Sequence, residues 1–256
     1  MRLLKLFILS IFLSCFISCG VSYNKEKLIE QLEALVKKEC DSDSKASIFG
    51  KTLYLDMELD ALTSKNQDQA VEAVKKMQNA VISITRVVLS SDSEIQFMVV
   101  SVFDKNKNVL FRIIQNIEDI KAYFYMRISK GDYESRSLME IEGPEYAKAM
   151  IEDKHDITLE EYVGRMIVSQ IDMASRSNPF FGALISMIRL RYEGYEDSAL
   201  ILSTAAEIDD KTESLIKGMV AEEVKKYSEK YNVDFKTFRI INLKDNSTSL
   251  NTNPHL

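Results

Sequence analysis

Two kinds of apolar periodicity alternate along residues 52–142, and their order is the feature that most constrains the fold. Every second residue is apolar in 52–60, which predicts a strand with one buried face and one acidic face. Apolar residues recur at spacings of three and four in 66–88, which predicts a long helix. Two β-rich runs, 95–103 and 109–115, flank a turn-forming Asp-Lys-Asn-Lys-Asn segment and predict a hairpin.

Residues 117–129 fit two periods at once. The apolar residues recur at three and four from Ile117 onwards, which favours a helix, but they also alternate from Ala122 to Ile128, which favours a strand. We expect the helix. A strand over 136–142 follows it in either case.

The resulting order is strand, helix, strand, strand, helix, strand, which is the split βαβ arrangement of the ferredoxin-like fold. We therefore expect an α+β domain over 51–143, in which two helices cover one face of a four-stranded antiparallel sheet. With 117–129 as a strand, the domain is instead one long helix on a curled sheet of four or five strands. Both alternatives belong to the α+β class.

The pattern is mainly helical over 144–243. Helices are expected over 145–152, 158–175, 179–193 and 209–231. Residues 198–206 fit either a helix or a buried strand, and we expect a helix. A last strand over 233–243 is expected to return to the sheet, on which the helical part packs, and the polar residues 244–256 predict a mobile tail.

Residues 1–18 have the layout of an export signal that is removed from the mature protein. Arg2 and Lys5 give it a positive start, and about 12 apolar residues follow, fewer than the roughly 20 that a membrane-spanning helix needs. Residues 25–39 then predict an amphipathic helix. We expect its apolar stripe to pack on its own domain, the alternatives being lipid or a partner protein.

The segment FISCG at 16–20 resembles the lipobox of bacterial lipoproteins, with Phe16 where that family usually has Leu. The resemblance implies that Cys19 becomes the lipidated N-terminus, with Cys15 a poorer candidate and an unlipidated cleaved signal the alternative. It also implies a cell-envelope protein that faces the periplasm or the cell exterior, at the outer membrane where the cell has one. Residues 19–50 would then be the lipidated cysteine, a short tether and the amphipathic helix.

The charge of the chain bears on its partners. Removal of 1–18 takes Arg2 and Lys5 from the 33 basic residues and none from the 39 acidic ones, which leaves a net charge of −8. An acidic chain without clustered Lys and Arg is a poor nucleic-acid binder, so no such partner is expected. Anionic lipid would also repel it, so membrane association would rest on the lipid at Cys19 alone.

Few residues are suited to catalysis. After Cys15 and Cys19, only Cys40 remains, so we expect no intramolecular disulfide and a small buried apolar role for Cys40. His155 and His255 are the only histidines, which argues against a Ser-His-Asp triad. The chain has no glycine-rich phosphate loop, and we expect no cofactor.

Three short motifs have a chemical and a structural interpretation, and we favour the structural one for each. Ser214–Lys217 matches the Ser-x-x-Lys pattern of penicillin-recognising enzymes without their accompanying motifs. The acidic loop 152–156 offers cation ligands, but such loops usually cap the following helix. Asp56 and Glu58 share one strand face, as acid/base catalysis would allow, yet such pairs arise by chance among 39 acids. We predict no catalytic or metal-binding residue.

Tyr123, Tyr125 and Tyr133 are the candidate binding surface, because neighbouring aromatic rings can form a platform for a glycan or a peptide. The sequence as a whole favours a lipid-anchored, non-catalytic protein that binds or scaffolds another envelope protein or polymer. The alternatives are a carboxylate-based envelope hydrolase, marked by acids with raised pKa values in one cleft, and a protein that binds a small apolar ligand in an apolar cavity.

Overall fold

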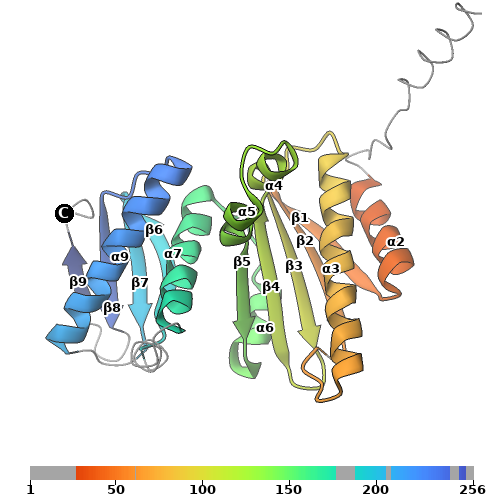
Figure 1. Ribbon diagram of the computed structural model, residues 1–256, viewed down its shortest axis with the longest axis horizontal. Coiled ribbons are helices and arrows are strands. Elements are labelled where there is room, and N and C mark those ends of the chain that lie inside the picture. The colour runs from red at the N-terminus through yellow and green to blue at the C-terminus, as the bar shows by residue number, and fades with distance from the viewer. Residues whose placement is uncertain (1–26, 61, 177–187, 206–208, 243–247, 252–256) are drawn as a thin grey trace, which may run out of the picture. The chain divides into compact units, whose positions relative to one another are not determined.

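The structure is a computed structural model that describes residues 27–60, 62–176, 188–205, 209–242 and 248–251. Over these residues the fold is α+β, as expected, and the chain divides into two compact units (Figure 1). The first unit contains the residues up to 112 together with 116–121 and 142–154, and the second contains the remainder. The predicted export signal and Cys19 lie outside the described residues.

A five-stranded mixed sheet has the order β1-β2-β3-β4-β5. Its strands are β1 (Ser44–Phe49), β2 (Thr52–Leu59), β3 (Phe97–Asp104), β4 (Val109–Asn116) and β5 (Leu138–Glu142). β1 and β2 form an antiparallel hairpin, whereas β2 and β3 pair in parallel. Parallel neighbours need a crossover connection, which α3 (Gln67–Leu89) provides.

Two helices, α2 (Leu28–Cys40) and α3, cover the sheet in the first unit (Figure 1). α2 contacts α3 and β1, and α3 contacts β3. The core consists of apolar side chains from these helices and from the strands, including Leu32, Val36, Ile84, Leu53 and Leu55, all fully buried. α6 (Pro144–Glu152) also belongs to this unit.

The strands expected at 52–60, 95–103 and 109–115 and the helix at 66–88 are confirmed within a few residues. The antiparallel ferredoxin-like topology is not confirmed, because the sheet is mixed and its neighbours β2 and β3 run parallel. The expectation missed β1, whose serines and lysine give an edge strand without strict alternation.

The helical alternative for 117–129 is confirmed in its first part. α4 (Ile117–Phe124) is helical, and Met126, at a positive φ of 56°, lies in the turn that follows it. A second short helix, α5 (Lys130–Arg136), precedes β5.

The second unit contains a four-stranded sheet of order β6-β7-β8-β9. Its strands are β6 (Arg191–Glu196), β7 (Ala199–Thr204), β8 (Thr237–Asn242) and β9 (Thr248–Asn251). β6 and β7 are antiparallel, β7 and β8 parallel, and β8 and β9 antiparallel. Helices α7 (Leu159–Arg176) and α9 (Asp210–Tyr231) contact each other, and α7 contacts β6.

This second sheet contradicts the prediction that residues 144–243 are mainly helical. The predicted helix 179–193 lies largely outside the described residues, and its end is strand β6. Residues 199–204, within the segment 198–206 for which we favoured a helix, form strand β7, because a short run buried on both faces lacks a helical period. The predicted tail contains β9, and the last predicted strand, β8, pairs with β7 in the second sheet.

The two units repeat one order of elements: helix, hairpin, long helix, and then two further strands. The first unit has α2, β1, β2, α3, β3 and most of β4, and the second has α7, β6, β7, α9, β8 and β9. In each, the hairpin's second strand pairs in parallel with the strand after the long helix. Asp56 of β2 therefore corresponds to Ser203 of β7, because each is five positions into its strand.

Candidate functional site

A cavity of about 840 Å³ lies within the first unit. It is lined by the end of α2 and the following loop, by β1 to β4, and by α6 with the residues after it. Five acids and four lysines line it: Asp41, Asp43, Asp56, Glu58, Glu152, Lys37, Lys45, Lys105 and Lys154. A cavity of this size fits a small molecule or a short segment of a larger one.

Three side chains from neighbouring strands form the floor of the cavity. The Cα partners of Asp56 in β2 are Lys45 in β1 and Ser101 in β3. Residues directly opposite one another in a sheet project from the same face. Lys45, Asp56 and Ser101 therefore form one polar row across three strands, on the face opposite Leu55 and the helical layer.

Asp56 is only half satisfied in its hydrogen bonding. Its Oδ2 pairs with Lys154 Nζ, and the two side chains are 18% and 14% exposed. Lys154 Nζ also lies 3.4 Å from Ser47 Oγ and 5.9 Å from the centroid of the Tyr54 ring. The second carboxylate oxygen, Oδ1, is buried and has no hydrogen-bond partner among the described residues.

Ser101 is also unsatisfied. The residue is 1% exposed, and its Oγ has no hydrogen-bond partner in the described part of the chain. The same holds for the buried Oγ of Ser44, at the start of β1. Leaving a buried polar group without a partner costs about 1–3 kcal/mol, so proteins rarely retain such groups without a reason.

Two further ion pairs lie at the rim of the cavity, where the side chains are exposed. Lys37 Nζ lies 2.8 Å from Asp43 Oδ1, and Lys105 Nζ lies 2.6 Å from Glu58 Oε2. The hydrogen bond between Lys37 and Asp43 raises the pKa of the lysine and lowers that of the carboxyl. The hydrogen bond to Glu58 likewise raises the pKa of Lys105.

The polar side chains of the lining are carboxylates, ammonium groups and hydroxyls. No histidine or cysteine lines the cavity. The described residues contain no cluster of three or more His, Cys, Asp or Glu side chains that could hold a metal ion.

The predicted tyrosine surface lies in the second unit. Tyr123 and Tyr133 stack, with ring centroids 4.7 Å apart and an interplanar angle of 9°. Gln115 Nε2 donates to the Tyr133 hydroxyl at 2.7 Å. The ring of Tyr125, which is 68% exposed, instead faces the Arg127 guanidinium at 5.4 Å. The structure thus brings two of the three rings together, and the role of this surface stays a prediction.

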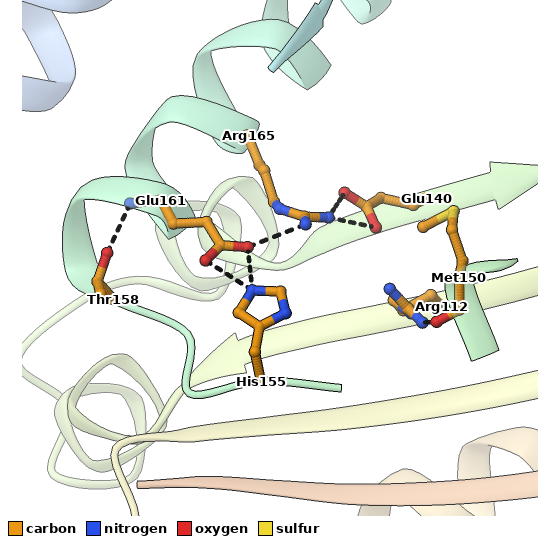
Figure 2. A network of polar contacts seen from close by, with 7 residues as sticks. All are labelled: Arg112, Glu140, Met150, His155, Thr158, Glu161 and Arg165. Carbon is orange, nitrogen blue, oxygen red and sulfur yellow. Dashed lines mark hydrogen bonds and ion pairs between the residues drawn. The ribbon is translucent and has the colours of Figure 1, made fainter. Parts of the chain in front are cut away.

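His155 and the start of α7 form a polar network in the second unit (Figure 2). His155 Nε2 lies 2.9 Å from both carboxylate oxygens of Glu161, and Thr158 Oγ1 accepts a hydrogen bond from the Glu161 N–H. Arg165 contacts Glu161 at 2.9 Å and Glu140 at 3.0 Å. Burial lowers the pKa of Arg165, but the two carboxylates raise it by more than burial lowers it. The pKa is therefore raised overall, and the guanidinium stays charged. These contacts join α7 to β5 within the unit.

Cys40 and Lys217, for which the sequence favoured a structural role, lie among structural contacts. Cys40 is 2% exposed, as expected for a small buried apolar side chain, and burial raises its pKa. Lys217 of the Ser-x-x-Lys motif pairs with Glu213 at 2.7 Å on α9.

No described helix combines the length and the apolar character needed to cross a bilayer. Comparison with protein families, with curated proteins and with solved structures finds no match for this chain.

Sequence reasoning placed Asp56 on the correct strand face but did not assign it to a site, and it missed Lys45, Ser101 and Lys154. The alternation of β2 placed Asp56 and Glu58 on one face, which is correct. Lys154, 98 residues away in the chain, carries no local signal of its position. Ser101 has a detectable signal, because it is the one polar residue in the apolar run from Phe97 to Phe103.

Proposed function

We propose that the chain is a lipid-anchored protein of the cell envelope that binds a segment of another envelope molecule, a protein or a polymer, in the cavity of its first unit. Cys19 would carry the lipid, and the body would face the periplasm or the cell exterior. The role is non-catalytic: the cavity recognises and holds its ligand.

The observation that carries this proposal is the pair of buried oxygens without partners, Asp56 Oδ1 and Ser101 Oγ, in the floor of the cavity. Buried polar atoms in folded proteins nearly always have hydrogen-bond partners. Two unsatisfied atoms on adjacent strands, on the face that lines a cavity of about 840 Å³, are well placed to meet a bound ligand.

The cavity favours binding over the two alternatives from the sequence. Five carboxylates line the cavity, as a carboxylate-based hydrolase needs, but three of them, Asp43, Asp56 and Glu58, are already held in ion pairs with lysines. Only Met57, Phe103, Leu110 and Ile151 are apolar among the lining residues. A polar ligand therefore fits better than a wholly apolar one.

Photo-crosslinking in cells tests the binding role. A benzophenone amino acid replaces Phe103, which lines the cavity, or Val71 on α3, which is 61% exposed and does not line it. We expect ultraviolet light to give a discrete envelope adduct from position 103 and none from position 71. Equal labelling at the two positions, or none at position 103, would contradict the proposal.

A further inference from the structure

We infer that the group bound in the cavity is a primary ammonium carried on an alkyl stem. This inference rests on the proposed binding role of the cavity and specifies its ligand. Such a group occurs in two sources, the side chain of a lysine or similar diamino acid within a peptide, and a free aliphatic diamine.

The first step concerns which partner the unsatisfied atoms need. An ionised carboxylate oxygen only accepts hydrogen bonds, so Asp56 Oδ1 requires a donor. The hydroxyl oxygen of Ser101, 1% exposed and on the same face of the adjacent strand, can accept as well. An ammonium has three donors and no acceptor, so one ammonium can donate to both atoms.

The second step excludes Lys154 as the missing donor. Its Nζ already pairs with the other oxygen of Asp56, and it also contacts Ser47 Oγ and the Tyr54 ring. These contacts direct its ammonium toward Oδ2. Lys154 thus holds the carboxylate in place and leaves Oδ1 for a second donor.

The third step is the charge of the lining. Three lysines pair with three acids: Lys37 with Asp43, Lys105 with Glu58, and Lys154 with Asp56. Asp41, Glu152 and Lys45 line the cavity without an ion pair among the described residues. Two negative charges against one positive charge leave the cavity one negative charge in excess, which favours a cation over a neutral or anionic ligand.

The fourth step concerns the body of the ligand. Phe103, Leu110 and Ile151 provide apolar surface in the same cavity as the polar row. An alkyl stem can lie against such surface while its charged end reaches polar partners. A neutral alcohol offers a donor without the charge, and a carboxylate offers neither, so these two groups are the natural negative comparisons.

Calorimetry and NMR titration of the purified chain test this inference with four probes. The probes are cadaverine, Nα-acetyl-lysine methylamide, pentanol and hexanoate. We expect at least one of the two amines to bind at least about tenfold more tightly than pentanol, because a charged donor makes a stronger hydrogen bond than a neutral one. Hexanoate should not bind. Cadaverine alone indicates a free diamine, and the capped lysine alone a peptide.

Two variants locate the binding, each with a matched control. Asp56→Asn should weaken amine binding at least about tenfold, and Asp234→Asn, an exposed aspartate of the second unit, should leave it unchanged. Because Asp56→Asn also removes the partner of Lys154, Ser101→Ala is the second variant. It disturbs no observed hydrogen bond, so it should weaken amine binding without lowering the melting temperature. Ser203→Ala, which removes a hydroxyl that donates to Glu193, should lower the melting temperature and leave binding unchanged.

Equal affinity for the amines and pentanol, or equal effects of Asp56→Asn and Asp234→Asn, would overturn the inference. Failure of the proposed function gives a different result. Adducts at position 103 without amine binding would show that the cavity has a ligand of another class. Amine binding without adducts would show that it takes a free amine and no envelope segment.

Discussion

Two aspartates on neighbouring strands show how one residue type has different roles within a single sheet. Asp104 at the end of β3 is fully buried, and one oxygen accepts hydrogen bonds from the Thr63 N–H at 2.8 Å and the Thr63 hydroxyl at 2.6 Å. Its other oxygen accepts from the Asn106 N–H at 2.9 Å. Asp56 on β2 has one satisfied oxygen and one without a partner. The satisfied carboxylate fixes a loop, and we propose that the half-satisfied one contacts a ligand.

The hydrogen bonds to Asp104 predict a pH-dependent contribution to stability. Burial raises the pKa of Asp104, but the hydrogen bonds from Thr63 and Asn106 outweigh it, so the pKa is lowered overall. A lowered folded pKa stabilises the protein above the unfolded pKa of about 3.9, and this stability is lost as the pH falls through the folded value. Asp104→Asn should therefore lower the free energy of unfolding by about 1–2 kcal/mol at pH 7.

Urea unfolding at pH 7 and near pH 3 measures the effect. The difference between wild type and Asp104→Asn should shrink at the lower pH, because below about pH 3.9 the unfolded chain takes up a proton at this carboxyl that the folded state binds less readily. Asp234→Asn, at an exposed position, is the matched control and should change little at either pH. A difference that stays constant from pH 7 to pH 3 would show that the ionised state of Asp104 is irrelevant.

At the residue scale, the sequence could identify the face of a strand but not its partners across the fold. Asp56 and Glu58 alternate with apolar residues, so their common face follows from the two-residue period of a strand. The pairing of Asp56 with Lys154 depends on where the chain after α6 returns to the sheet. No local pattern encodes that return.

Long elements were predicted well and short ones poorly, for a physical reason. α3 and α9 contain 23 and 22 residues, enough turns for the helical period to be distinct. β7 has six residues and is buried at five of them, so it has neither the alternation of a half-buried strand nor the length of a helix. The pairing of β7 with β6 and β8 decides its conformation.

Gly164 in α7 is required by the packing of that helix on the second sheet. A Cβ at this position would lie 2.5 Å from Tyr192 Cε2 and 2.9 Å from Leu200 Cδ1. Alanine favours a helix over glycine by about 1 kcal/mol, but forcing extra volume into a packed core costs about 1–3 kcal/mol. Gly164→Ala should therefore lower the free energy of unfolding.

Gly218 in α9 is the matched control, because no atom lies within 4 Å of a Cβ built there. Gly218→Ala should raise the free energy of unfolding by about 0.5–1 kcal/mol through helix propensity alone. Thermal and urea unfolding of both variants measure the two changes. Opposite signs are expected, and a stabilising effect of Gly164→Ala would show that α7 does not pack on β6 and β7 as described.

The whole molecule repeats one order of elements twice, and the sequence gives no fixed repeat from which to predict this. The two copies share topology while their residues differ: Asp56 and Ser101 of the first unit correspond to Ser203 and Ile241 of the second. Apolar periodicity constrains which residues form the apolar core and leaves the opposite face of each sheet free to differ. The α+β class was therefore predictable, whereas the second sheet and the cavity were not.

Charge and anchoring give a prediction at the scale of the whole chain. Without residues 1–18 the chain has a net charge of −8, so attraction to anionic lipid would not hold it at a membrane, and the acyl chains proposed at Cys19 would do so alone. Salt screens electrostatic attraction, with a Debye length of about 3 Å at 1 M, but does not release buried acyl chains.

We therefore expect the protein to stay in the membrane fraction of cells washed with 0.05 M and with about 1 M NaCl alike. Cys19→Ser should move it to the soluble fraction at both concentrations, whereas Cys15→Ser, a matched change four residues earlier, should leave it bound. Mass spectrometry of the N-terminal peptide then places the lipid on Cys19. Release of the wild-type chain by salt would show that a charged surface holds it, and an unmodified N-terminus on membrane-bound protein would show that some other contact does.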